Sequence, residues 1–284
     1  MAEPLGLEEV RRALAEDAAA GGGDVTTSLL GPAAAARATG RFIAGGTFVV
    51  AGLPVVATVL QDLEPGSCLD VAAAEGIRVR DGDVLAVATA SARTLLAGER
   101  VALNFLQRLS GIATATRRAV DAVAGTAARI THTRKTTPGL RALERYAVRV
   151  GGGVENRASL AEAVLWKDNH WALLNGARST EQGALRAVLA KAPQGIPIVV
   201  EVETDAQLDE ALAAGVTHIL ADNQPPERIA AWVRRAGSGV TMQASGGITA
   251  ENAAAYARAG AHLISIGALT HSAPAAPIGF ELDA

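Results

Sequence analysis

The sequence of 284 residues contains a single cysteine, Cys68, so no disulfide can form within the chain and a metal site built on thiolates is not expected. No uninterrupted apolar run approaches the roughly 20 residues that a bilayer-spanning helix needs. The N-terminal stretch MAEPLGLEEVRRALAED is acidic and amphipathic, without the apolar region of a signal peptide. We therefore expect a cytoplasmic protein without a membrane partner.

The chain also lacks an excess of positive charge, since its formal net charge is −3, which gives no support for a nucleic-acid partner. It has no Walker A loop, and no G-x-G-x-x-G follows a strand-like run, so an NTPase or a dinucleotide-binding dehydrogenase is disfavoured. Its hydrophobic share of 49% and charged share of 19% are typical of a globular protein that forms a core. We expect an enzyme.

Lysine is scarce, because only three of the 26 basic residues (Lys plus Arg) are lysines. One of them lies next to Arg134 in the stretch THTRKTTPGL, which has neither helical nor strand periodicity. Lysine offers a compact charge on a flexible stem, whereas arginine offers a rigid planar fork. The pair Arg134–Lys135 is therefore predicted to belong to a site that uses both kinds of cation.

The first third of the sequence has mixed patterning. A helix is predicted near residues 6–17, followed by apolar stretches that the turn signals AGG, EPGS and RDGD separate. A long helical stretch then runs from about 92 to 124. These features indicate a small α+β domain with an antiparallel sheet, and we expect the tail SAPAAPIGFELDA to pack back on it.

From about residue 128 the pattern becomes regular, because strand-like runs alternate with helical stretches. Alternation of this kind predicts parallel strands joined by right-handed crossovers. The runs are ARITHT, AVLWKD, IPIVVEVE, THILADN, VTMQAS and HLISIG. Six strands are too few for the eight-stranded barrel of this type. The sequence therefore predicts an incomplete barrel or an open sheet.

Charged and phosphate-compatible residues follow the predicted strands, where ligands bind in parallel α/β barrels. One half of this rim is cationic and suits a polyanion, with Arg134, Lys135, Arg157 and Lys167. The other half is acidic, with Glu203 and Asp222, and suits ribose hydroxyls or Mg²⁺. Near it, the turns around Ser245–Gly246–Gly247 and Gly267 let the backbone approach a phosphate closely, and Thr249 is the expected helix N-cap after the first turn.

The residues described so far resemble the quinolinate phosphoribosyltransferase family. The likeness is carried by TRKTTPGLRALERYAVRVGGG, WKDNH, EVE, ADN, ASGG and GALTHS, and it extends to GGDVTTSLL, VVAGLP and ERVALNFLQRLSGIATAT. It implies an N-terminal α/β sandwich domain over 1–113, joined by the tail 272–284, and an incomplete six-stranded α/β barrel over 114–271. It also implies a homodimer or a dimer-based hexamer.

The same resemblance implies an activity and a set of site residues. Quinolinate and phosphoribosyl pyrophosphate, with Mg²⁺ as cofactor, would give nicotinate mononucleotide, pyrophosphate and CO₂. The implied catalytic residues are Lys135, Lys167, Glu203 and Asp222, of which Glu203 and Asp222 would also hold the metal. The implied substrate-binding set adds Arg100 from the neighbouring subunit, Thr133, Arg134, Asn156, Arg157, Ser245, Gly246, Gly247, Gly267 and His271.

The sequence departs from the family pattern around the predicted acid-binding region. Asn156 stands at the position of a histidine, Glu155 at that of an asparagine and Gln243 at that of a glutamate, and His132 takes a position that is usually small or acidic. Trp166 and Trp171, which bracket KDNH, are interpreted as packing residues. Three hypotheses therefore stay open: transfer to quinolinate, transfer to a different aromatic or pyridine acid, and a non-catalytic nucleotide-binding homologue.

Overall fold

The structure is a computed structural model that describes residues 4–18, 23–176 and 184–283. The chain forms two compact units, each described below by itself. The first unit comprises residues 1–117, 136–152 and 269–284, and the second comprises 118–135 and 153–268. The domain boundaries expected from the sequence stay a prediction, and the two units differ from them chiefly in grouping 136–152 with the first unit.

The first unit contains the expected antiparallel sheet, with strand order β12-β1-β5-β3. These strands are β1 (Arg37–Ala44), β3 (Cys68–Val71), β5 (Val84–Ser91) and β12 (Ile278–Asp283), and a two-stranded ribbon joins β2 (Phe48–Val49) to β4 (Arg78–Val79). The C-terminal tail packs back as predicted, because β12 pairs with β1 in a register that sets Phe42 opposite Phe280. Their rings lie 4.8 Å apart between centroids.

The helices of the first unit include the two that the sequence predicts near residues 6–17 and from about 92 to 124. They are α1 (Leu7–Asp17), α2 (Val25–Ser28), the 3₁₀ helix η1 (Gly31–Ala35), α3 (Leu53–Leu63) and α5 (Arg141–Val150), with most of α4 (Ala92–Ala122) and of α11 (Ala268–His271). The helix α3 was not expected from the sequence, because its β-branched run PVVATVL also fits a buried strand. Its Val55, Val56 and Val59 are fully buried.

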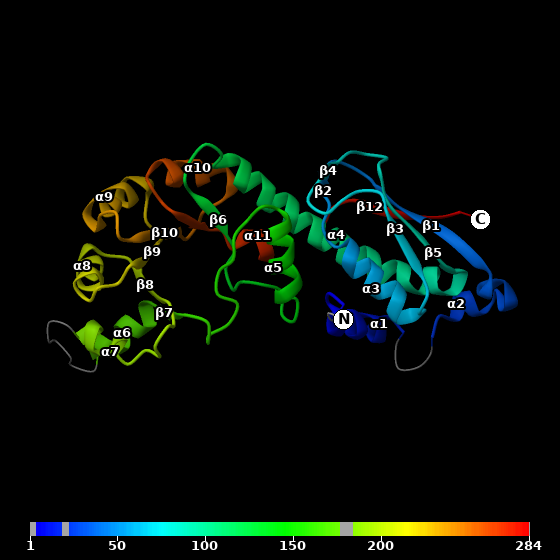
Figure 1. Cartoon of the computed structure of the whole chain (residues 1–284), viewed down its shortest axis with the longest axis horizontal. Coiled ribbons are helices and arrows are strands. Elements are labelled where there is room, and N and C mark those ends of the chain that lie inside the picture. The colour runs from blue at the N-terminus through cyan, green and yellow to red at the C-terminus, as the bar shows by residue number, and fades with distance from the viewer. Residues whose placement is uncertain (1–3, 19–22, 177–183, 284) are drawn as a thin grey trace. The chain divides into compact units, whose positions relative to one another are not determined.

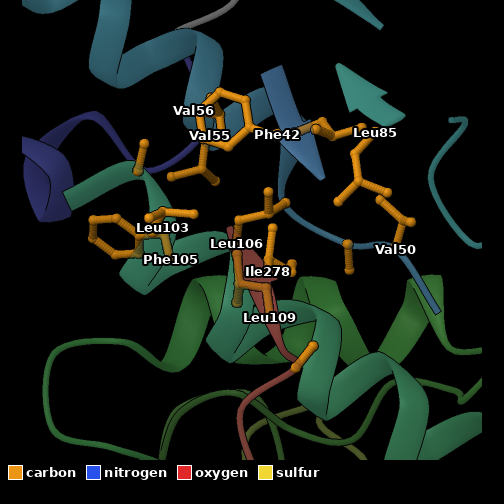
Figure 2. Packing of buried hydrophobic residues seen from close by; sticks show 14 of the residues in the cluster. Phe42, Val50, Val55, Val56, Leu85, Leu103, Phe105, Leu106, Leu109 and Ile278 are labelled. Atoms are coloured by element: carbon orange, nitrogen blue, oxygen red, sulfur yellow. The ribbon is translucent and has the colours of Figure 1, made fainter. Parts of the chain in front are cut away.

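A single apolar cluster holds the first unit together, and Figure 2 shows its centre. Phe42 and Leu85 reach it from the sheet, while Leu106 and Leu109 come from the α4 stripe. These side chains are at most 1% exposed, and each such burial stabilises the fold by about 1.5–3 kcal/mol. The C-terminal strand adds Ile278 to the same cluster.

The second unit contains the predicted parallel sheet of six strands, in the order β6-β11-β10-β9-β8-β7. The strands are β6 (Arg129–Thr131), β7 (Val164–Trp166), β8 (Ile198–Val202), β9 (His218–Asp222), β10 (Thr241–Ser245) and β11 (Leu263–Ser265). Their pairings run in one continuous series that ends at β6 and at β7. The incomplete barrel expected from the sequence is therefore confirmed.

Helices alternate with these strands. The sequence did not predict α6 (Asp168–Gly176), but helical stretches were expected where α7 (Ala184–Leu189), α8 (Asp205–Ala213), α9 (Pro226–Ala236) and α10 (Ala250–Arg258) lie. Figure 1 shows α8, α9 and α10 alongside β8, β9 and β10. The stretch STEQGALRAVLAKA, whose sequence pattern also predicts a helix, begins outside the described residues. Across the described ranges, no helix is long and apolar enough to cross a membrane.

Candidate active site

Lys167 and Glu201 form an ion pair at the C-terminal ends of β7 and β8. The Lys167 Nζ lies 3.2 Å from Glu201 Oε2, and the Glu201 side chain is only 8% exposed. Burial raises the pKa of Glu201, Lys167 lowers it, the charge of Asp222 raises it, and the Asp168 backbone N–H lowers it. Glu201, Lys167 and Asp222 therefore share one electrostatic environment at the sheet edge that the sequence predicts as the site.

Glu201 is not among the site residues expected from the sequence, which include Glu203 from the same run, IPIVVEVE. Both residues would point to the same face of a strand, since side chains alternate with a period of two. The strand, however, ends at Val202, and Glu203 is exposed beside α8, where its backbone N–H donates to Gln207 Oε1. A carboxylate inside a buried apolar strand is costly unless it has a partner, and that signal could have found Glu201.

Asp222, the last residue of β9, is held by its neighbour. Asn223 donates from Nδ2 to Asp222 Oδ2 at 2.7 Å, and from its backbone N–H to the Ser245 carbonyl at 2.9 Å. Among the described non-glycine residues, Asn223 alone has a positive φ, 52°. Asparagine tolerates this left-handed conformation better than most residues. The end of β9 is thereby fixed to the end of β10.

The predicted phosphate turn follows β10. Gly246 and Gly247 have φ angles of 92° and 61°, a region that favours glycine. A Cβ on Gly246 would meet Asn223 Oδ1 at 2.2 Å, so this glycine is needed for the close approach of the two loops. A Cβ on Gly247 would meet nothing within 4 Å. Thr249 is the N-cap of α10, as predicted, and its backbone N–H donates to Asn252 Oδ1.

Arg134 and Arg157 belong, with Lys167, to the cationic half of the rim. Burial lowers the pKa of Arg157, the charge of Arg134 lowers it further, and Glu201 raises it, which indicates that these charges act on one another. Arg157 Nη1 donates to the Ala163 carbonyl at 3.0 Å. Arg134 Nε is buried without a hydrogen-bond partner in the part of the chain that the structure describes. A buried donor of this kind is costly, and an anionic ligand would satisfy it.

Three departures from the family pattern lie together. His132, 1% exposed, accepts from the Asn156 backbone N–H at Nε2 (3.2 Å), and its carbonyl accepts from Asn156 Nδ2 (2.9 Å). Asn156 Oδ1 accepts from the Arg157 N–H at 2.8 Å, and Glu155 Oε2 lies 3.6 Å from His132 Nε2. The Asn156 amide, predicted to bind substrate, is thus hydrogen-bonded to the backbone of His132 and to the backbone of Arg157.

The remaining predicted residues of the second unit also follow the strands. Thr133 Oγ1 accepts from the Lys135 backbone N–H at 3.1 Å, and the Lys135 residue is exposed. Ser245 is the last residue of β10, and Gly267 comes shortly after β11. The second unit therefore places Thr133, Lys135, Ser245 and Gly267 at the same ends of the parallel strands as Asp222.

Two predicted site residues belong to the first unit. Arg100 lies on α4 with its side chain 59% exposed, and its Nη2 is 3.9 Å from Glu99 Oε1. His271 ends α11, is exposed, and its Nδ1 lies 2.6 Å from Ser272 Oγ. Their roles at the site stay predictions.

The carboxylates fit Mg²⁺ only in part. No cluster of three or more His, Cys, Asp or Glu side chains that could hold a metal occurs among the described residues. Mg²⁺, however, is usually bound through one or two carboxylates together with substrate phosphates and water. Asp222, beside the glycine turn, meets that requirement.

The fold and this rim define an α/β-barrel protein with a site for anionic, phosphate-bearing ligands. Its sequence matches two family models: "Quinolinate phosphoribosyl transferase, N-terminal domain" over residues 24–110 and "Quinolinate phosphoribosyl transferase, C-terminal domain" over 112–282. The chain belongs to the quinolinate phosphoribosyl transferase family.

Similar proteins carry related names. The nicotinate-nucleotide pyrophosphorylase [carboxylating] of Mycobacterium leprae is 42% identical over 280 residues, covering 97% of this chain and 96% of that protein. The probable enzyme of the same name from Bacillus subtilis is 42% identical over 73% of this chain and 71% of its own length. The crystal structure of nicotinate-nucleotide pyrophosphorylase from Ehrlichia chaffeensis superposes with a TM-score of 0.90 at 32% identity, covering 100% of each chain.

Proposed function

We propose that this protein transfers the phosphoribosyl group of phosphoribosyl pyrophosphate to quinolinate, with decarboxylation, as a step of NAD biosynthesis. The observation that supports this most is the rim itself, where Lys167, Glu201 and Asp222 lie at the ends of the adjacent strands β7, β8 and β9, and the charges of Arg134 and Glu201 act on Arg157. A dicarboxylate and a pyrophosphate ester both need charge-assisted contacts, which are about twice as strong as neutral hydrogen bonds.

The cations bind the acid and the leaving group. Arg134 presents its buried Nε, and its planar fork suits a carboxylate, which can accept two parallel hydrogen bonds. Arg157 adds a second positive charge beside it. Lys135, the residue after Arg134, is exposed and supplies a point charge for a carboxylate or pyrophosphate oxygen.

The carboxylates act on the ribose. The quinolinate nitrogen forms a bond to C1 of the ribose while the C1–O bond to pyrophosphate breaks, and C1 develops positive charge. Glu201 and Asp222 stabilise that charge electrostatically, an effect that is strong where water is excluded. The adjacent carboxylate then leaves as CO₂, its bonding electrons stay on the ring carbon beside the cationic nitrogen, and that carbon takes up a proton from water.

Mg²⁺ is the proposed cofactor. Asp222 would be its main protein ligand, with Glu203 as the second predicted carboxylate, and the substrate phosphates would complete its coordination. When bound, the ion would neutralise charge on the pyrophosphate group and so make it a better leaving group.

One assay tests the proposal directly. Purified protein is incubated with Mg²⁺, phosphoribosyl pyrophosphate and each of a panel of pyridine carboxylates, and pyrophosphate, CO₂ and the nucleotide product are measured. Equal amounts of the three products from quinolinate are expected. Turnover of another acid but not of quinolinate would transfer the assignment to that acid. Absence of turnover with every acid would contradict an enzymatic role.

The cluster of His132 and Asn156 favours one alternative acceptor class. Asn156 can offer only neutral hydrogen bonds, and its amide already contacts the His132 carbonyl and the Arg157 N–H. An aromatic acid that carries a hydroxyl or amide in place of one carboxylate would suit this loop. The panel above includes such acids.

We further propose a cytoplasmic homodimer, or a hexamer built from dimers, in which Arg100 reaches the partner's site. Its exposed position on α4 is compatible with such a role. When inactive Arg100→Ala and Lys135→Ala subunits are mixed in equal amounts, about half of the dimers are mixed and each regains one intact site of two, so about a quarter of wild-type activity should return. Verified subunit exchange without any recovery would argue against a shared site.

A further inference from the structure

The first turn of α6 contacts both members of the Lys167–Glu201 pair. Trp171, 4% exposed, donates its indole Nε1–H to the backbone carbonyl of Glu201 at 2.8 Å. The Asp168 backbone N–H of the same turn lowers the pKa of the Glu201 carboxyl. The segment 167–171 thus contacts Glu201 at its main chain through Trp171 and at its side chain through Lys167.

The indole replaces a missing strand partner. The pairing of β7 with β8 ends where Trp166 lies opposite Val200, and the chain then turns into α6. A buried carbonyl without a donor costs free energy comparable to a lost hydrogen bond, so the next carbonyl of β8 needs another partner. Trp171 provides it from the helix.

His170 fixes the other member of the pair. Lys167 directly precedes α6, and its backbone N–H donates to His170 Nδ1 at 2.9 Å. The Lys167 carbonyl in turn accepts from the backbone N–H groups of His170 and Trp171, at 2.9 and 3.0 Å. This arrangement matches half of a capping box, with histidine in the place that glutamate or glutamine usually takes.

We propose that Trp171 and His170 are positioning residues that hold the Lys167–Glu201 pair in its reactive arrangement. The inference deepens the proposed function and rests on it for the role of the pair. Trp171 holds the main chain of Glu201, and His170 holds the main chain of Lys167. Neither side chain needs to touch the substrate for this effect.

The other two tryptophans, Trp166 and Trp232, allow a positioning role of Trp171 to be distinguished from a packing role. Trp166 contacts Trp171 edge-on at 6.1 Å, yet its buried indole Nε1 has no partner among the described residues. Trp232, 2% exposed, donates its indole to Asp205 Oδ1 at 2.6 Å and joins α9 to the start of α8. Trp232 is therefore a suitable control for Trp171, because it is also a buried indole that donates one hydrogen bond but lies outside the site.

The first experiment compares Trp171→Phe with Trp232→Phe. Both variants keep an aromatic ring and lose one buried donor, so both should lower the melting temperature. Only Trp171→Phe should lower kcat, by about tenfold, the rate equivalent of one hydrogen bond, with each KM within about threefold of wild type. A kcat within twofold of wild type, or an equal loss in Trp232→Phe, would overturn the proposal.

Variants at the exposed His170 serve if Trp171→Phe does not fold. Asparagine places an acceptor oxygen near the position of Nδ1, so His170→Asn should retain a kcat within about twofold of wild type. His170→Ala removes the acceptor and should lower kcat several-fold more. Equal kcat values for the two variants would contradict the role of His170.

A measurement without turnover separates this inference from the proposed function. In a crystal structure of Trp171→Phe, or of His170→Ala, Lys167 Nζ and Glu201 Oε2 should lie farther apart than the present 3.2 Å. An unchanged pair in both variants would overturn the positioning role. A wild-type protein with the pair intact that turns over no acid would count against the proposed function instead.

Discussion

The two units differ in how they surround a buried carboxylate. Glu144 of the first unit is fully buried and accepts from Arg108 Nε and Nη2 and from the N–H and Oγ1 of Thr137, at 2.7 to 3.2 Å. The Glu201 carboxylate of the second unit accepts a hydrogen bond from Lys167 Nζ, and the charge of Asp222 opposes its ionisation. The first carboxylate is saturated with donors, whereas the second is not.

A second carboxylate of the first unit follows the same pattern. Glu64 accepts from the hydroxyl of Ser91, the hydroxyl of Thr94 and the Ser91 N–H, and these hydrogen bonds lower its pKa to about 2. Burial raises the pKa of Glu201 instead. A saturated carboxylate stabilises the fold, while an incompletely satisfied one retains capacity for a ligand, as perturbed groups in active sites commonly do.

The largest expected effect concerns the lysines of the second unit. Lys135→Ala and Lys167→Ala should each lower kcat/KM by about 100-fold, since one charge-assisted contact to a desolvated anion contributes about 3 kcal/mol. Lys191→Ala, which removes an exposed lysine outside the site, is the matched control and should behave like wild type. Steady-state kinetics checks this, and near-wild-type turnover in Lys135→Ala or Lys167→Ala would remove that lysine from the site.

The next effect concerns stability. Glu144→Gln should lower the free energy of unfolding by about 3 kcal/mol, because it leaves the Arg108 charge without its buried partner. Glu201→Gln should be at least as stable as wild type at pH 7, because the fold disfavours the ionised form of this residue. Urea unfolding of both variants measures the difference. Equal losses would show that the two carboxylates are not distinguished by their donors.

The smallest effect is the acid dependence that Glu64 contributes. Its pKa is lowered from 4.5 to about 2 on folding, so its contribution to stability is complete above pH 4.5 and is lost as the pH falls from 4.5 to 2. Glu64→Gln should therefore be less stable than wild type at pH 6, and the difference should shrink at pH 3. A constant difference across this window would contradict the assignment.

Much of the fold follows from the sequence because each strand of the parallel sheet is a short apolar run between clear turn residues. The runs ARITHT, THILADN and VTMQAS correspond to β6, β9 and β10 within a few residues. The helix α3 was missed because its valines fit a strand as well as a helix, and only its packing against the core decides between them.

The positions of Asp222 and the Gly246–Gly247 turn were predictable from the sequence, because both lie at clear strand ends. The choice between Glu201 and Glu203 was not, because both would point to the same face of a strand and alternation cannot choose between them. The contact of Trp171 with the Glu201 carbonyl also depends on the end of β7, which sequence patterns locate only within a few residues.

The central claim is that the incompletely satisfied Glu201, with Lys167 and Asp222, forms the reaction centre of a phosphoribosyltransferase. The most direct measurement is kcat for Glu201→Gln and Glu203→Gln with quinolinate and phosphoribosyl pyrophosphate at saturating Mg²⁺. Glu201→Gln should lower kcat by about 100-fold or more, the size of a lost electrostatic contact in the transition state, and Glu203→Gln by much less. A larger loss in Glu203→Gln than in Glu201→Gln would contradict the account.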